Sequence, residues 1–92
     1  MKPFKVKVRN MRSDSSYNAV SNQFIIEVGD KLVFQSYDSI IAVKEHGKVT
    51  LDKVYWDYSS TTGKYRNQFL GEGIAETRKK IKEGIYKLAN LN

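Results

Sequence analysis

The sequence predicts an α+β protein: an antiparallel meander of four to five strands, followed by two short helices that pack on one face of the sheet. Three observations predict this fold. Apolar and polar residues alternate through much of the first half of the chain, which is the period of a half-buried strand. Gly29-Asp30 is a two-residue hairpin loop between apolar segments. The last third carries helix caps and apolar residues at helical spacing.

The first strand is predicted at residues 4–9, where two sets of side chains alternate: apolar Phe4, Val6 and Val8, and basic Lys5, Lys7 and Arg9. One side of this strand is therefore expected to be apolar and the other basic. The segment from Asn10 to Asn22 is polar and rich in Ser and Asn, so it is predicted to be a mobile loop.

Two hairpins are predicted next. Residues 23–28 and 31–37 flank Gly29-Asp30, a Gly-X loop that suits a type II′ turn, and residues 39–44 and 48–52 flank Glu-His-Gly. One face is expected to gather Phe24, Ile26, Val28, Leu32 and Phe34, and the opposite face Ile25, Val33, Ile41 and Val43. The second face is more apolar than a solvated sheet needs, so the C-terminal helices are expected to cover part of it.

Two helices are predicted after the sheet. The first is capped by Thr61 or Thr62 and runs to about Leu70, ending at Gly71 or Gly73. The second runs from about residue 74 to 83, and Gly84 ends it. Residues 85–92 alternate in polarity and fit either a short closing strand or an extended segment.

Size and composition predict one domain over residues 1–92. The chain has no cysteine, which excludes a disulfide framework and a thiolate zinc site. The N-terminus lacks the apolar segment of a signal peptide, and no apolar run approaches the roughly 18 residues that span a bilayer. We therefore expect a soluble protein of the cytoplasm that does not engage a membrane.

The string Thr61-Thr62-Gly63-Lys64 is similar to the end of a phosphate-binding loop. That loop needs a first glycine and a hydroxyl residue after the lysine, where this chain has Tyr58 and Tyr65. A helix start is the better interpretation. No other motif predicts catalysis, since the single histidine, His46, lies in a turn and the carboxylates lie at strand ends. The sequence predicts a protein that is not an enzyme and has no cofactor or metal site.

Three strings are similar to a known group of proteins: F-Q-S-Y-D-S-I-I-A at residues 34–42, G-K-V-T-L-D at 47–52, and V-Y-W-D-Y-S-S-T-T-G-K-Y-R-N-Q-F-L at 54–70. They resemble small proteins encoded by phages and mobile elements of Gram-positive bacteria, in which S-Y-x-S-x-I-A and W-D-Y-S-x-T-T-x-K-Y-x-x-x-F-L recur. The resemblance implies expression in a bacterial host cell and binding to host factors. Defence nucleases are among these host factors, and binding to nucleic acid is the alternative that the resemblance implies. It implies no catalytic residues.

The first functional hypothesis is a binding protein that engages a host protein or a protein–nucleic acid machine, for example as an anti-defence inhibitor of the anti-CRISPR kind. Aromatic residues commonly anchor interfaces, and Tyr55, Trp56 and Tyr58 are the candidate contacts. Strand-like alternation would set Tyr55 opposite the other two. Packing of all three in the core is an equally good interpretation. The protein is expected to be a monomer or small homo-oligomer.

The second hypothesis is sequence-independent binding to DNA or RNA. The net charge is +6, with both ends basic and the middle mildly acidic, a balance that favours a polyanionic partner or an acidic protein surface. The candidate residues are Lys5, Lys7, Arg9, Lys64, Arg66, Arg78, Lys79, Lys80 and Lys82. A solvated basic helix face explains them equally well. A third hypothesis is a minor structural protein of a virion.

Overall fold

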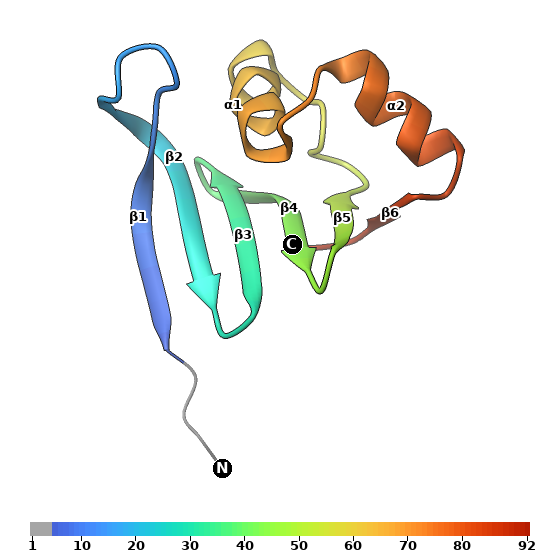
Figure 1. Ribbon diagram of the computed structural model, residues 1–92, viewed down its shortest axis with the longest axis horizontal. Helices are drawn as coiled ribbons and strands as arrows, with labels where there is room; N and C mark the ends of the chain where they lie inside the picture. The colour runs from blue at the N-terminus through green and yellow to red at the C-terminus, as the bar shows by residue number, and fades with distance from the viewer. Residues whose placement is uncertain (1–4) are drawn as a thin grey trace.

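The computed structural model describes residues 5–92, with six strands and two helices in that range (Figure 1). In chain order they are β1 (Val6–Arg12), β2 (Ala19–Val28), β3 (Lys31–Ser36), β4 (Ser39–Glu45), β5 (Lys48–Asp52), α1 (Ser60–Leu70), α2 (Ile74–Lys82) and β6 (Tyr86–Ala89). The strands form one sheet in sequence order, antiparallel from β1 to β5. The predicted α+β meander with two helices is confirmed, with six strands in place of four or five.

The sixth strand is the closing strand that the alternation in the tail allowed. β6 pairs with β5 in parallel, with Val49 opposite Tyr86 and Leu51 opposite Leu88. Parallel neighbours need a long crossover, and α1 and α2 supply it. Beyond β6, the side chain of Asn92 accepts the N–H of Ile40 at 2.7 Å and donates to its carbonyl at 3.0 Å. The end of the tail is therefore attached to β4.

Two tight turns set the register of the meander. Gly29 has a φ of 56° between the paired residues Val28 and Lys31, which fits the predicted type II′ turn. His46 and Gly47 have φ values of 52° and 75°, as a type I′ turn requires.

The register corrects the predicted division of apolar residues between the two faces. Across the Gly29-Asp30 turn, Ile26 pairs with Val33 and Ile25 pairs with Phe34. Paired residues of antiparallel strands share a face. Phe34 therefore lies on the face of Ile25, and the expectation that it lies with Ile26 was wrong.

One face of the sheet packs against the helices and holds the core. Ile25, Phe34 and Leu51 are buried there. The Phe34 ring stacks on Phe69 of α1 with 5.6 Å between centroids. Ile41 is also buried, because the register shifts by one residue between Phe34 and Gln35 and leaves Ile41 outside the ladder. Figure 1 shows α1 near the upper ends of β3 and β4 and α2 beside β6.

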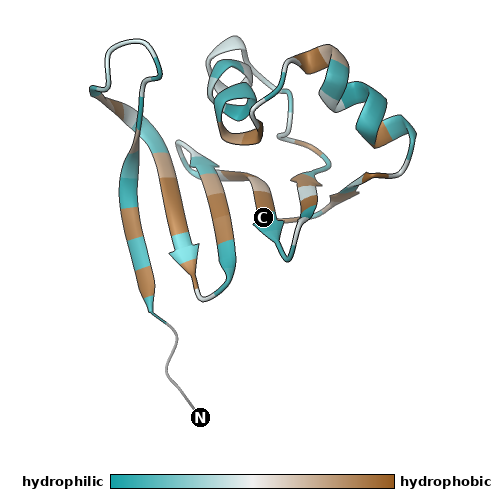
Figure 2. Cartoon of the chain, viewed as in Figure 1, coloured by the Kyte–Doolittle hydropathy of each residue, from teal (hydrophilic) through white to brown (hydrophobic). Residues whose placement is uncertain are grey.

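The predicted loop from Asn10 to Asn22 is wrong at both ends. β1 continues to Arg12 and β2 begins at Ala19, so only residues 13–18 connect them. Polar residues are tolerated because β1 is an edge strand that faces solvent. Asn10 also donates its side-chain amide to the Val20 carbonyl at 2.9 Å. Figure 2 shows the alternation of hydrophilic and hydrophobic residues along β1.

The helix ends follow their capping residues. Ser59 accepts the N–H of Thr62 at 3.1 Å and caps α1, where Thr61 or Thr62 was expected. The Thr62 hydroxyl instead forms a 2.9 Å hydrogen bond with Ser36 on β3. Gly71 ends α1 with a φ of 70°, and Gly84 follows α2 with a φ of 77°. Both glycines were predicted, and both supply the left-handed residue after a helix.

Replacing Gln23 with methionine is expected to stabilise the protein. Gln23 is fully buried, and neither polar atom of its side chain has a hydrogen-bond partner among the described residues. A buried polar group without a partner costs about 1–3 kcal/mol, and methionine has a similar shape. We expect the free energy of unfolding in urea to rise by about 1 kcal/mol. A loss of that size would contradict the prediction, and Gln35→Met on β3 is the half-buried control.

Candidate binding surface

The aromatic segment after β5 is a turn and not a strand. Asp52 accepts the N–H groups of Val54 and Tyr55 at 3.0 and 2.8 Å, an arrangement that stabilises a turn. The rings of Tyr55 and Tyr58 consequently meet edge to face, with 5.5 Å between centroids. The expectation that alternation separates Tyr55 from Tyr58 was therefore wrong.

Burial divides the three predicted partner-binding aromatics. Tyr55 and Trp56 are half-buried and pack against the core, whereas Tyr58 is 45% exposed. Outside this segment, Tyr17 and Tyr37 are 75% and 48% exposed. Both have positive φ values. Tyrosine is uncommon in that conformation, so the sequence did not predict these two exposed positions. Tyr58 is thus the most exposed of the three predicted aromatics.

Arg66 is a structural residue, contrary to its expected place in a phosphate-binding patch. Its side chain is 1% exposed. The guanidinium donates to the Trp56 carbonyl at 2.9 Å, to Asp57 at 3.0 Å and to Asn67 at 2.9 Å, and it lies 5.3 Å from the centre of the Trp56 ring. Turning of the chain at 53–58 brings these partners to α1. The guanidinium therefore fastens that turn to the helix.

Lys80, another candidate for nucleic-acid binding, forms an ion pair within the fold. Its ammonium lies 2.7 Å from the buried carboxylate of Glu72, which also accepts hydrogen bonds from Thr77 and Tyr86, each at 2.7 Å. Burial alone would raise the pKa of Glu72, but the hydrogen bonds from Lys80, Thr77 and Tyr86 outweigh burial and lower that pKa. This cluster joins α2 to β6.

The lowered pKa values of Asp52 and Glu72 predict that the free energy of unfolding decreases in acid. Burial alone would raise the pKa of Asp52, but hydrogen bonds from the N–H groups of Leu91, Tyr55 and Val54 and from the Asn92 side chain outweigh it, so the pKa is lowered. Glu72 behaves likewise. Because both pKa values are lower in the folded protein, the unfolded chain binds protons more readily than the folded one. The two carboxylates therefore contribute their full stabilisation above their ordinary pKa values of 3.8 and 4.5, and this contribution is lost as the pH falls through the lowered values.

This prediction is checked by urea unfolding at several pH values between about 3 and 7. The free energy of unfolding is expected to fall below about pH 4.5. Asp52→Asn and Glu72→Gln should each start lower at pH 7 and decline less steeply. An equally steep decline in both variants would show that other groups govern the acid response.

The remaining basic candidates form two separate groups. Lys5, Lys7 and Arg9 lie on or beside β1, and Arg9 pairs with Glu27 at 3.0 Å. β1 and β6 are opposite edges of the sheet, and α2 packs beside β6. The basic strand and the basic helix therefore do not merge into one patch.

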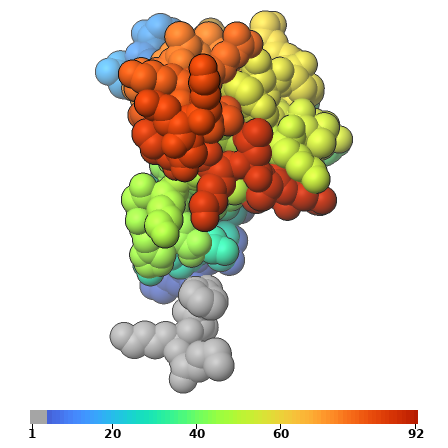
Figure 3. Space-filling model, turned by 90° about the vertical axis from the view of Figure 1, so that its right-hand side faces the viewer, coloured from blue at the N-terminus to red at the C-terminus, as the bar shows by residue number. Residues whose placement is uncertain are grey.

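Two exposed basic residues of the helices border an open groove of about 650 Å³. Lys64 of α1 and Arg78 of α2 line it, and Arg78 lies 3.4 Å from Asp57 at its margin. Lys79 and Lys82 are exposed on α2. Figure 3 shows α2 and the segment leading to α1 together on this side of the molecule. Of the predicted nucleic-acid residues, Lys64, Arg78, Lys79 and Lys82 are therefore exposed on α1 and α2.

An apolar surface lies on the opposite side of the sheet from the helices. We call it the open face, and its residues are Val6, Val8, Phe24, Ile26, Val28, Val33, Ile40 and Val43. All are half-buried or exposed, with Val6 and Val8 at 60% and 62% exposure. Among residues 5–92, neither helix covers this face. The sequence did not predict this composition. The predicted faces placed Val33 and Val43 with core residues, and they placed Leu32 and Phe34 with residues of the open face.

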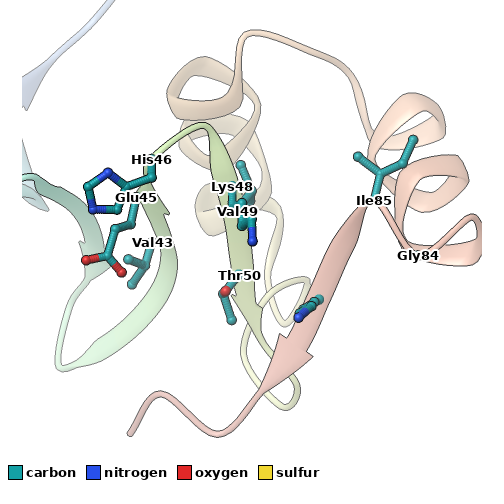
Figure 4. Close-up of a pocket in the computed structure, with 9 residues that line it drawn as sticks. Val43, Glu45, His46, Lys48, Val49, Thr50, Gly84 and Ile85 are labelled. Atoms are coloured by element: carbon teal, nitrogen blue, oxygen red, sulfur yellow. The ribbon is translucent and has the colours of Figure 1, made fainter.

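Two hollows meet on the open face. One of about 450 Å³ includes Val33 and Ile40, and one of about 470 Å³ includes Lys48 and Ile85. They share Val43, Glu45 and Thr50. Figure 4 shows the second hollow, with Glu45 and His46 at the end of β4, and Lys48 and Thr50 of β5 between them and Ile85. We call the combined depression the β4 groove.

The described part of the chain contains no group of three or more His, Cys, Asp or Glu side chains placed to hold a metal ion. Across the same residues, no helix is both long and apolar enough to cross a membrane.

Comparison with known proteins identifies a family. A family model described as "Family of unknown function (DUF8033)" matches residues 6–86. No curated protein and no solved structure matches the chain.

Proposed function

Since the chain belongs to DUF8033, a family of unknown function, we propose a role from its surface: a non-enzymatic binding protein that engages another protein through the open face. The observation that carries this proposal is a sheet that is apolar on both sides and covered on one. Antiparallel sheets with a solvated face normally alternate apolar and polar residues. Large exposed apolar patches commonly mark interaction sites.

The energetics support this use of the open face. Fully burying a valine-sized side chain contributes roughly 1.5 kcal/mol or more. Because the side chains of Val6 and Val8 are mostly exposed, most of this stabilisation is not gained by folding and is available to a complex. A partner that covers them together with Ile26 and Val33 would bury a continuous apolar surface across β1, β2 and β3.

The proposed setting is the cytoplasm of a bacterial host. The resemblance of residues 34–42, 47–52 and 54–70 to phage-encoded proteins supports a host protein, or a protein–nucleic acid machine, as the partner. An anti-defence inhibitor is one such role. Binding by steric cover needs only a complementary surface and no reacting groups.

The test is quantitative capture from a bacterial lysate with the immobilised protein. Val8→Lys/Val33→Lys places charge on the open face, and Ala75→Lys/Glu76→Lys on the exposed side of α2 is the matched surface control. Thermal unfolding establishes that both variants are folded. We expect the open-face variant to capture at least roughly tenfold less of the proteins that the unmodified protein captures, because each introduced lysine would be buried without a partner in the complex. Equal capture by the open-face variant would contradict the proposal.

A second candidate function is nucleic-acid binding, which the groove between Lys64 and Arg78 favours. Fluorescence polarisation with short single- and double-stranded DNA and RNA, at about 50 and 200 mM salt, tests it. Binding through phosphates should weaken steeply with salt, and Arg78→Ala/Lys79→Ala/Lys82→Ala should make the salt dependence shallower. Lys5→Ala/Lys7→Ala is the control from the separate basic group. The absence of binding at the lower salt concentration would remove this candidate.

A further inference from the structure

We propose that the β4 groove takes an amphipathic helix of the partner protein, with an apolar stripe flanked by acidic residues. The inference rests on the proposed function and specifies the partner of the open face. Three features carry it: the dimensions of the groove, the charges at its rim, and the pairing of the backbone beneath it.

The groove has the length and floor for a short helix. Ile40 and Val43 of β4 form the floor, with Val33 on one side and Ile85 on the other. β4 has seven residues, so it is about 20 Å long at the usual rise of a strand. A helix of about 13 residues has that length. Its apolar stripe would lie along β4 and form a third layer on the sheet.

The rim of the groove carries more positive than negative charge. Lys31 lies on the β3 side, and Lys48 and Lys87 lie on the β5 and β6 side. Glu45 is the single acidic lining residue. Among the described residues, none of these four groups takes part in an ion pair within 4 Å. Glu45 lies on β4, directly opposite Lys31 and Lys48 in the ladder. Acidic residues on both flanks of a docked helix would therefore meet lysines that outnumber this one carboxylate and form no ion pair with it within 4 Å.

The backbone beneath the groove favours a helix over an extended peptide. β4 lies between β3 and β5, which occupy both of its hydrogen-bonding edges. An extended peptide gains affinity by adding backbone hydrogen bonds at a free sheet edge. It would find none on this face, and its own N–H and C=O groups would lose contact with water. A helix satisfies its backbone internally and needs only a complementary surface.

A second copy of this chain fits the groove less well. A symmetric dimer would place the same rim on both sides, so lysines would approach lysines at a net charge of +6 per chain. Pairing through the free edge of β1 would likewise bring together copies of Lys5, Lys7 and Arg9. Lysines on an edge strand are known to oppose such pairing.

The experiment uses two synthetic peptides of about 14 residues, which is the helix length expected for β4. Both carry the same leucine stripe, and the remaining positions are glutamate in one and lysine in the other. Titration into the ¹⁵N-labelled protein is followed by NMR. The acidic peptide is expected to shift amide signals of β3, β4 and β5 and to bind at least roughly tenfold more tightly than the basic peptide. Equal binding, or no binding of the acidic peptide, would overturn the inference.

A charge-reversed protein supplies the matched control. In Lys31→Glu/Lys48→Glu/Lys87→Glu, the preference is expected to switch to the basic peptide, while thermal unfolding confirms that the variant is folded. An unchanged preference for the acidic peptide would overturn the role of these lysines.

The same variant separates this inference from the proposed function in the lysate capture. If charge reversal leaves capture unchanged while Val8→Lys/Val33→Lys abolishes it, the open face binds protein but the acidic helix is overturned. If neither variant reduces capture, the proposed function itself fails. Loss of the same proteins with both variants supports the two together.

Discussion

Replacing Arg66 with alanine is expected to lower the free energy of unfolding by about 3–5 kcal/mol, the range for breaking a buried charged pair. The substitution would leave a cavity beneath α1 and remove hydrogen bonds to the Trp56 carbonyl, Asp57 and Asn67. Gly63 also lies against the guanidinium: a Cβ added there would be 3.6 Å from its nearest atom. A small domain has a modest margin of stability, so much of the variant should be unfolded at 37 °C.

Urea unfolding followed by Trp fluorescence checks this prediction, since Trp56 is the only tryptophan and lies against Arg66. Arg66→Lys should also be destabilised, because an ammonium cannot reproduce the planar set of three hydrogen bonds. Lys64→Ala, on the exposed side of the same helix, is the control and should change stability by less than about 0.5 kcal/mol. Similar effects of the changes at 64 and 66 would show that Arg66 does not hold the turn.

Replacing Asp52 with alanine is expected to lower the free energy of unfolding by about 2–4 kcal/mol, since buried N–H groups lose a charged acceptor. One carboxylate oxygen accepts the N–H groups of Val54 and Tyr55, and the other accepts that of Leu91 at 2.8 Å. The side chain thus joins the end of β5, the aromatic turn and the tail after β6.

Hydrogen exchange gives this prediction a local signature. The amides of Val54, Tyr55 and Leu91 should exchange faster in Asp52→Ala by more than global destabilisation explains, because each loses its acceptor. Asp38→Ala, in the exposed turn between β3 and β4, is the control and should leave these amides unchanged. Uniform acceleration across the sheet would contradict a local role for Asp52.

Features that depend on neighbouring residues were predictable from the sequence. Gly71 and Gly84 mark the helix ends because a left-handed residue after a helix favours glycine. Gly29-Asp30 marks a hairpin because its backbone conformation suits a two-residue loop. The length of that loop also fixes the register of β2 and β3, since it pairs Val28 with Lys31 and therefore Ile26 with Val33. The β2 and β3 part of the open face was thus available from the sequence, and the error there came from dividing the residues by alternation without counting across the turn. The places of Ile40 and Ile41 depend on the register shift between Phe34 and Gln35, which alternation does not predict.

The positions of Arg66 and Lys80 could not be predicted in the same way. On a helix, each resembles an ordinary exposed basic residue. The burial of Arg66 depends on the turn at Trp56 and Asp57, and the ion pair of Lys80 depends on the carboxylate of Glu72. The tertiary fold brings each partner close. Asp52 is a similar case, because its acceptor role for Leu91 joins residues 39 positions apart. Periodicity and capping preferences contain no information on such pairings.

The parallel pairing of β5 with β6 has a consequence for folding kinetics. Each strand from β1 to β5 joins its neighbour through a short connection, so these pairings close small loops at modest entropic cost. The β5–β6 pairing joins residues that α1 and α2 separate in the sequence, such as Val49 and Tyr86. Contacts between residues so distant in sequence form slowly. In any partly folded chain in which the meander is assembled without β6, the outer edge of β5 is unpaired. In such a chain the exposed edge and the open face would both be vulnerable to aggregation.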